Sequence, residues 1–211
     1  MNRAQRRKQG IKQPKADVKK LRGEDLMRMR TETIKSFYPD FTTIFLQTLF
    51  DEVDFQTYPN HMGRLDRVER QIRKRIAAME DIASADEFMK NYVDMREIVG
   101  IQFGRIADVC TDLNTKGLVG KTYTLTRAKY NEMTTHAGVA AFSVYFPIYI
   151  LALYDLTKWE SQEDGKGYMD RVVDRYMLKV DCLEDEYAQM TFELFREGLK
   201  DEVGYVVKPL D

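Results

Sequence analysis

Hydrophobic residues recur with a helical period over residues 65–79 of the chain. The apolar positions are separated by three, four, four and three residues, which places them on one face of a helix. They are Leu65, Val68, Ile72, Ile76 and Met79. The same spacings return at Met169, Val172, Tyr176, Val180 and Leu183. Each stripe needs other helices to cover it, so both segments are predicted to be core helices.

The two stripes lie 104 positions apart, and the same displacement relates other residues without gaps. In the first copy these are Ile44, Phe45, Leu49, Phe50, Asp51, Gly63, Asp66, Arg67, Glu80, Asp81 and Phe88. In the second copy they are Ile148, Tyr149, Leu153, Tyr154, Asp155, Gly167, Asp170, Arg171, Glu184, Asp185 and Phe192. The match extends outward to Leu21 with Leu125 and to Gly100 with Gly204. Self-similarity at a fixed period predicts tandem duplication of one structural unit.

Helix start and stop signals divide the region before the first stripe. We expect a first helix over about 24–37, which Pro39 stops, because proline cannot continue a helix. Asp40 is then placed to cap a second helix over about 41–53. After the first stripe, Ser84 and a glutamate three residues later form a capping-box pattern. This pattern predicts a further helix, which either ends near Gly100 or continues to about residue 113.

A long uncharged segment covers residues 137–154 in the second copy. Its 18 residues only just reach the length of a membrane span, and Pro147 and polar side chains interrupt it. The aligned segment of the first copy is more polar, with threonines at 42, 43 and 48. We therefore expect a central core helix over about 139–156, with a membrane span and a partner-binding helix as the alternatives.

These patterns together predict an all-α fold of about eight helices. It would consist of two tandem, structurally similar helical units packed through apolar faces about a pseudo-twofold relation. Residues 23–113 form the first unit, 114–123 the linker and 124–211 the second unit, after a flexible or conditionally helical arm over 1–22. A composition that is 44% hydrophobic and 32% charged, with five prolines, suits such a globular body.

The net charge of −1 conceals a strong asymmetry along the chain. Nine basic residues and the single Asp17 give the arm a charge of +8, which leaves −9 on the other 189 residues. The basic residues are Arg3, Arg6, Arg7, Lys8, Lys12, Lys15, Lys19, Lys20 and Arg22. We take these nine as candidate partner-binding residues. The arm would bind nucleic-acid phosphates in a salt-sensitive manner, bind a protein, or serve only as a solubilising tail.

Candidate catalytic chemistry is sparse in the sequence. The only histidines are His61 and His136, and the pairing of Glu132 with His136 has no counterpart in the first copy. The acidic residues at 181, 184, 185 and 186 lack the ligand spacing of a calcium loop and suit a solvated helix face. No phosphate-binding glycine loop, zinc-spaced cluster or nucleophile motif occurs. We therefore expect no enzyme activity, no metal and no cofactor.

The cysteines and aromatic residues indicate where the protein works and how it folds. Cys110 and Cys182 form no metal or redox motif, and no apolar signal segment follows the charged beginning of the chain. Reduced thiols in the cytoplasm are expected. Aromatic residues crowd positions 37–55 at helical spacing, which favours core packing over a surface that stacks bases. Trp159 is expected to anchor the equivalent corner of the second unit.

The opening of the chain carries a family resemblance. Met1-Asn2-Arg3-Ala4-Gln5-Arg6-Arg7-Lys8, continuing with Gly10-Ile11-Lys12 and Pro14, resembles the leader of small uncharacterised proteins of phages and prophages of Gram-positive bacteria. Related openings occur on phage tail assembly chaperones. The second copy, over about 125–207, is similar to the body of those small proteins, in Pro147-Ile148, Gly165-Lys166-Gly167 and Asp201-Glu202-Val203-Gly204. The extra unit departs from their single-copy pattern.

This resemblance implies a phage or prophage origin and a bacterial cytoplasmic location, but it implies no activity. Together with the absence of catalytic motifs, it leads us to expect a non-enzymatic protein that binds a host or viral macromolecule. Such a protein would modulate a host process, counter a defence system or chaperone an assembly step. A protein partner is expected first, and a nucleic-acid-binding accessory protein that uses the basic arm is the alternative.

Overall fold

The computed structural model describes residues 18–52, 61–102, 118–184 and 190–210 of the chain. The elements are β1 (Val18–Arg22), α2 (Gly23–Ser36), α3 (Tyr38–Phe50), α5 (His61–Ala77), α6 (Ala85–Asp94), the π-helix η1 (Met95–Val99), β2 (Thr122–Thr126), α8 (Arg127–Thr157), α9 (Tyr168–Glu184) and α10 (Phe192–Val203). The fold is mostly helical, as predicted. Its two short strands pair with each other as an antiparallel ribbon.

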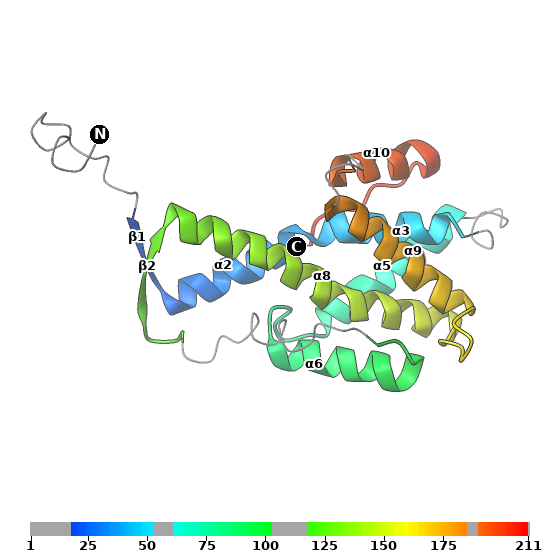
Figure 1. The fold of residues 1–211 in the computed structure, drawn as a ribbon, viewed down its shortest axis with the longest axis horizontal. Helices are drawn as coiled ribbons and strands as arrows, with labels where there is room; N and C mark the ends of the chain where they lie inside the picture. The colour runs from blue at the N-terminus through cyan, green and yellow to red at the C-terminus, as the bar shows by residue number, and fades with distance from the viewer. Residues whose placement is uncertain (1–17, 53–60, 103–117, 185–189, 211) are drawn as a thin grey trace, which may run out of the picture.

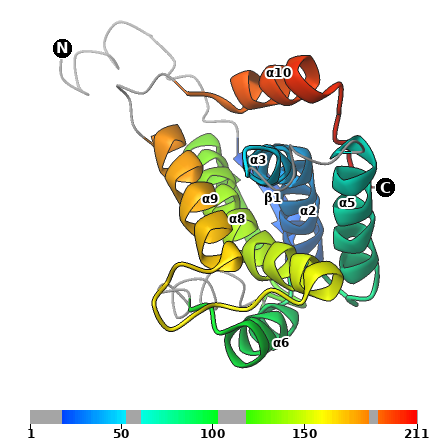
Figure 2. The ribbon, with the colours of Figure 1, turned by 90° about the vertical axis from the view of Figure 1, so that its right-hand side faces the viewer.

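Helix α8 is the central element around which the other helices pack. Helix α2 lies along its first half, and α5 and α6 lie along its second half (Figure 1). Viewed from one end, α9 flanks α8 on one side, and α3, α2 and α5 lie on the other (Figure 2). Helix α10 crosses over α3. The ribbon stands at the end of α2 and α8 that is remote from the other helices (Figure 1).

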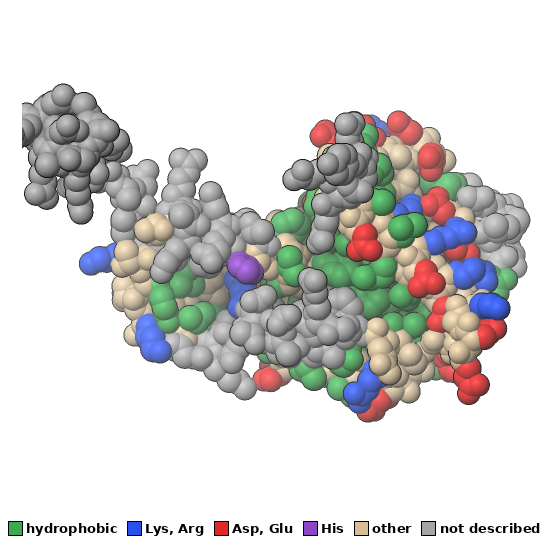
Figure 3. Space-filling view, viewed as in Figure 1, with side chains coloured by type: hydrophobic (Ala, Val, Ile, Leu, Met, Phe, Trp, Pro, Cys, Tyr) green, Lys and Arg blue, Asp and Glu red, His purple; other side chains and the backbone are tan. Residues whose placement is uncertain are grey.

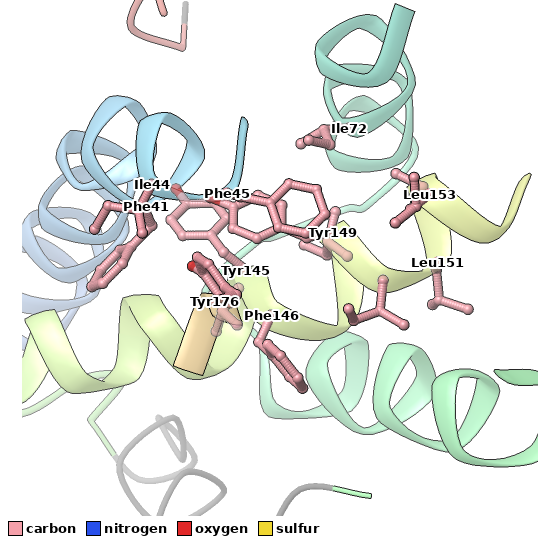
Figure 4. Close-up of a cluster of buried hydrophobic side chains, with 14 of the residues drawn as sticks. Phe41, Ile44, Phe45, Ile72, Tyr145, Phe146, Tyr149, Leu151, Leu153 and Tyr176 are labelled. Carbon is pink, nitrogen blue, oxygen red and sulfur yellow. The ribbon is translucent and has the colours of Figure 1, made fainter. Parts of the chain in front are cut away.

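Aromatic side chains fill the centre of the core (Figure 4). The rings of Phe45 and Tyr149 stack with their centroids 4.8 Å apart, and Tyr176 meets Phe45 edge-on at 5.5 Å. All three are completely buried. Burying a large apolar side chain contributes about 1.5 to 3 kcal/mol, so this cluster is a major source of stability. Tyr38 and Phe41 are also buried, so these two aromatic residues from the 37–55 segment pack in the core as predicted.

Both apolar stripes are covered by other parts of the chain. In the first stripe Leu65, Val68 and Ile72 are at most 3% exposed, and the remaining two residues pack against the core while partly buried. In the second stripe Met169 and Val172 are completely buried, as is the tyrosine that follows them. The predicted burial of the stripes is confirmed. Helix α5 ends at Ala77, so the last residue of the first stripe lies beyond the helix.

The uncharged segment over 137–154 belongs to one 31-residue helix, α8, which is longer than predicted and contains Pro147. Within it, Gly138–Thr157 is long and apolar enough to cross a membrane by length and composition, with a mean hydropathy of 1.7. In this fold 72% of that window is buried inside the protein. Its apolar side chains are therefore covered by the helices around it, as expected for a core helix.

The helix boundaries follow some sequence signals and contradict others. Ser84 caps α6 as predicted, because its hydroxyl accepts hydrogen bonds from the backbone N–H groups of Asp86 and Glu87. Gly100 adopts a left-handed conformation with φ of 85° and ends η1, so the alternative of an unbroken helix to residue 113 is wrong. The prediction that Asp40 caps the second helix is also wrong. Helix α3 starts at Tyr38, and Asp40 is instead buried in an ion pair with α10.

The end of the expected arm and the end of the expected linker are ordered together. Residues 18–22, predicted to be flexible or conditionally helical, form β1, and the linker predicted over 114–123 runs into β2 from Thr122. The backbone N–H and C=O groups of β1 find hydrogen-bond partners in β2, and those of β2 find them in β1. Neither strand could satisfy these groups by itself. Residues 1–17 and 114–117 lie outside the described residues.

Several contacts are related by the predicted displacement of 104, either because the two residues differ by 104 or because two contacts are reciprocal under that displacement. The register of the ribbon pairs Lys20 with Thr124, and Phe45 stacks on Tyr149. The ion pairs are reciprocal: Arg75 contacts Asp155 at 2.8 Å, and Lys179 contacts Asp51 at 2.6 Å. Tyr38 and Tyr145 are in ring contact, as are Phe41 and Phe142. Tandem duplication and the count of about eight helices stay predictions.

Candidate functional site

The structure places three of the nine predicted partner-binding residues in strand β1. Lys19, Lys20 and Arg22 belong to this strand, at the end of the molecule remote from α3, α5 and α10 (Figure 1). Blue side chains mark this end in Figure 3. Six predicted residues lie outside the described residues: Arg3, Arg6, Arg7, Lys8, Lys12 and Lys15.

Strand β1 pairs with β2 so that basic and hydroxyl side chains share one face. The register sets Lys20 opposite Thr124 and Arg22 opposite Thr122. Alternate residues of a strand point to the same side of a sheet, and directly paired residues lie on the same side as each other. All four side chains are exposed, whereas Leu21 and Tyr123, at the intervening positions, are partly buried. We call Lys20, Arg22, Thr122 and Thr124 the ribbon face.

The base of the ribbon is fastened to the start of α2. The backbone N–H of Gly23 donates to the carbonyl of Lys121 at 2.9 Å, and the N–H of Gly120 donates to the Glu24 carboxylate at 2.9 Å. That backbone hydrogen bond lowers the pKa of Glu24. A Cβ on Gly23 would lie 1.8 Å from the carbonyl oxygen of Leu118, so only glycine allows this close approach. The ribbon therefore has a defined orientation on the helices.

Sequence reasoning missed the contribution of β2 to this surface. Thr122, Thr124 and the exposed Lys121 were assigned to the end of a linker and to the start of the second unit. The alternating segment Thr-Tyr-Thr-Leu-Thr carries a strand signal, because β-branched and aromatic residues with period two favour strands. Its pairing with a basic strand about 100 residues earlier gives no signal in the local sequence. Lys20, Arg22 and Lys121 form what we call the basic pole.

Four buried carboxylates among the described residues are candidates for acid–base chemistry, and each is held by groups of the fold. They are Asp40, Glu52, Glu69 and Asp170. Glu69 accepts hydrogen bonds from the Tyr205 hydroxyl at 2.6 Å and from Arg73 at 2.9 Å. Arg73 also donates to the carbonyl of Lys208 at 2.5 Å, which ties the C-terminal segment to α5.

The other three carboxylates also hold parts of the fold together. Two of them pair with arginines that are distant in sequence, and the third binds the loop before α9. Asp40 pairs with Arg196, and Glu52 pairs with Arg175 at 3.1 Å. Asp170 accepts from the Ser161 hydroxyl at 2.5 Å and from the backbone N–H groups of the loop before α9. These contacts give each of the four carboxylates a role in holding the fold together, although Oε1 of Glu52 has an ion-pair contact but no hydrogen bond among the described residues.

The histidine and cysteine candidates are not brought into a cluster in the part of the chain that the structure describes. His136 is exposed on α8, and His61 opens α5, far along the chain from it. Cys182 is a free thiol and is partly buried. No group of three or more His, Cys, Asp or Glu side chains suited to a metal ion occurs among the described residues. The ribbon face is therefore the candidate site that we pursue.

Comparisons with protein-family models, with curated proteins and with solved structures found no match. The resemblance of the opening residues to phage and prophage proteins accordingly stays a prediction.

Proposed function

We propose that this protein is a non-enzymatic binding protein of the phage or prophage type suggested by its opening residues. It holds a host or viral macromolecule at the basic pole and thereby modulates a host process, counters a defence system or chaperones an assembly step. Lys20, Arg22 and Lys121 are exposed there, and six further basic residues precede Val18 in the sequence. A partner with acidic or anionic groups suits this pole.

A difference in net charge between the ribbon and helix α10 is the main support for this function. Helix α10, away from the ribbon, exposes acidic side chains that appear red in Figure 3. These are Glu193, Glu197, Asp201 and Glu202, and they outnumber the exposed Arg196 and Lys200 of the same helix. A ribbon of net positive charge and a helix of net negative charge orient an anionic partner toward the basic pole and away from α10. A nucleic-acid-binding accessory role through the same basic residues is the second candidate, favoured by the exposed lysine and arginine of β1.

The finer architecture that we propose is a duplicated unit arranged about a pseudo-twofold axis. In a twofold interface, if residue i contacts residue j, then the equivalent of j contacts the equivalent of i. The ion pairs Arg75–Asp155 and Lys179–Asp51 have this relation at a displacement of 104. The helix contacts show the same reciprocal relation: α5 packs on α8, and α9, which corresponds to α5 in the proposed repeat, packs on α3, which corresponds to part of α8. The central pair of the ribbon would then lie on the axis, so both copies would contribute to one binding surface.

Double-mutant cycles test the duplicated architecture. The two reciprocal ion pairs have similar side-chain exposure, 25% and 28% for Arg75 and Asp155 and 19% and 35% for Lys179 and Asp51. We expect a favourable coupling energy of about 1 kcal/mol or less for each pair, larger for Arg75, which donates to both oxygens of Asp155, than for Lys179, which makes one contact with Asp51. Urea unfolding of the single and double alanine variants gives both values. A strong coupling in one pair with none in the other would argue against equivalent environments.

Affinity capture from host cells tests the binding function. The tagged full-length protein is compared with a variant carrying Lys20→Gln, Arg22→Gln and Lys121→Gln. The matched control replaces three exposed lysines of the body: Lys74→Gln, Lys90→Gln and Lys166→Gln. We expect one enriched protein or nucleic acid that the first variant loses and the control retains. Enrichment of nothing, or equal loss in both variants, would refute binding through the basic pole.

A further inference from the structure

We propose that the ribbon face binds in the major groove of duplex DNA. This inference rests on the proposed function and names the class of partner. The ribbon stands at one end of the molecule, clear of the helical body (Figure 1). Its exposed face carries Lys20 and Arg22 from β1 and Thr122 and Thr124 from β2.

The width of a two-stranded ribbon matches one groove of DNA and excludes the other. Paired strands lie about 4.8 Å apart, and side chains add to the width and height of the ribbon. The major groove of B-DNA, about 12 Å wide, admits a two-stranded ribbon, whereas the minor groove is about 6 Å wide. The major groove of duplex RNA is too narrow for side chains to reach the bases. The shape therefore predicts a preference for duplex DNA over duplex RNA.

The side chains of the ribbon face have the donors and apolar groups that base edges require. Arginine and lysine donate to the guanine O6 and N7 atoms, and threonine offers a hydroxyl and a methyl group. Lys121 lies at the base of the same ribbon and is exposed, in position for phosphate contact.

The nearby acidic groups are engaged within the fold. Glu24 accepts the hydrogen bond from Gly120 that fastens the base of the ribbon, and Asp25 pairs with Arg28 at 3.2 Å. Arg22 lies close enough to the exposed Glu24 carboxylate to help lower its pKa, so part of the Arg22 charge is offset there, whereas Lys20 belongs to neither pair. The close approach of Gly23 to Leu118 holds the ribbon in a fixed orientation, so less conformational entropy is lost when it binds. An acidic protein would also match the positive charge of the ribbon face. It would not explain why this narrow face carries threonine hydroxyl groups beside the lysine and arginine.

The test measures binding of the full-length protein to a fluorescein-labelled duplex DNA and to a duplex RNA of the same sequence, by anisotropy over a range of salt concentrations. Lys20→Ala with Arg22→Ala should weaken DNA binding about tenfold through lost base contacts, whereas Lys121→Ala, which removes a phosphate contact, should lower the salt slope by about 0.9. The control Lys74→Ala with Lys90→Ala removes equal charge from exposed positions on α5 and α6 and should change affinity less than twofold.

A second pair of variants separates groove contact from charge. Thr122→Val with Thr124→Val keeps the β-branched shape that strands favour and replaces each hydroxyl group with a methyl group. We expect this pair to weaken DNA binding about threefold to tenfold with an unchanged salt slope. Circular dichroism and thermal unfolding establish that each variant is folded. Duplex RNA should bind at least about tenfold more weakly than DNA.

Three results would overturn the inference. Equal losses in the Lys20/Arg22 variant and the Lys74/Lys90 control would mean that charge acts without the ribbon. Equal binding of duplex RNA, or full affinity in the threonine variant, would mean phosphate contact without groove contact. No binding to DNA, with capture of a protein through the basic pole intact, would refute DNA as the partner while leaving the proposed binding function standing.

Discussion

Two buried tyrosines of the aromatic core offer a matched test of its hydrogen bonding. Tyr149 and Tyr176 are both completely buried and in ring contact, with centroids 6.0 Å apart (Figure 4). The Tyr149 hydroxyl shares a hydrogen bond of 2.9 Å with Thr42. The Tyr176 hydroxyl has no hydrogen-bond partner among the described residues. Replacing each tyrosine with phenylalanine removes the same atom from the same core, so the hydrogen bond is the main difference.

The expected effects have opposite signs. Tyr149→Phe loses a buried hydrogen bond and leaves the completely buried Thr42 hydroxyl without this partner, which should cost about 1 to 2 kcal/mol. Tyr176→Phe removes an unsatisfied buried hydroxyl, whose desolvation is unfavourable, and should stabilise the fold by about 1 kcal/mol. The volume of the core hardly changes in either variant, so packing contributes little to the difference.

Urea unfolding followed by circular dichroism gives the free energy of unfolding of both variants and of the parent protein. Similar slopes against urea concentration establish that the comparison reports stability rather than a change in the unfolded chain. The variants should differ by about 2 to 3 kcal/mol, with the parent between them. If Tyr176→Phe destabilised the protein as much as Tyr149→Phe, the Tyr176 hydroxyl would have a partner in solution and the reasoning would be refuted.

Three further predictions concern the ion pairs, the ribbon and the response to pH. Arg196→Ala should destabilise the protein by about 1 to 3 kcal/mol, because it leaves the buried Asp40 carboxylate unpaired while the arginine itself is 54% exposed. The control Arg28→Ala breaks an exposed pair and should cost less than about 0.5 kcal/mol, so equal losses in urea unfolding would count against the role of burial. Gly23→Ala should displace the turn at Leu118 and increase hydrogen exchange over residues 118–126, whereas Gly138→Ala meets only the Phe37 ring at 3.3 Å and should leave that exchange unchanged. Burial raises the pKa values of Tyr38, Tyr145, Tyr149, Tyr176 and Tyr205 above the ordinary value of 10.0. Since the unfolded chain then releases these protons first, stability should hold below about pH 10 and fall above it by up to about 1.4 kcal/mol per pH unit for each tyrosine. Urea midpoints measured across this range check the fall, and a flat profile through pH 11 would contradict it.

Local sequence determined much of the helical core. The spacing of Leu65, Val68 and Ile72 predicted a buried face, and Ser84 and Gly100 marked a helix start and stop that the structure confirms. These features depend on residues within a few positions of one another, since helical period and capping hydrogen bonds are local. The basic residues at positions 19, 20 and 22 were also apparent from the sequence as a candidate site.

Tertiary contacts decided the features that local patterns missed. Aspartate is a residue type that often caps helices, which led to the prediction for Asp40. In the structure Asp40 instead pairs with Arg196 of α10, which is 156 positions away in the sequence. Helix α8 extends back to Arg127 alongside α2, although the apolar segment alone predicted a later start. In each case the deciding partner is distant in sequence, so its effect does not appear in a short window of residues.

The candidate site illustrates the same division most clearly. Sequence determined which residues carry the charge, but only the pairing of β1 with β2 set Thr122 and Thr124 beside Lys20 and Arg22. An isolated five-residue strand leaves its backbone N–H and C=O groups without partners, so strand formation depends on a second segment. That segment lies about 100 residues away. The sequence thus identified the basic residues of the surface, and only the folded structure placed them on one side of a ribbon with the threonines.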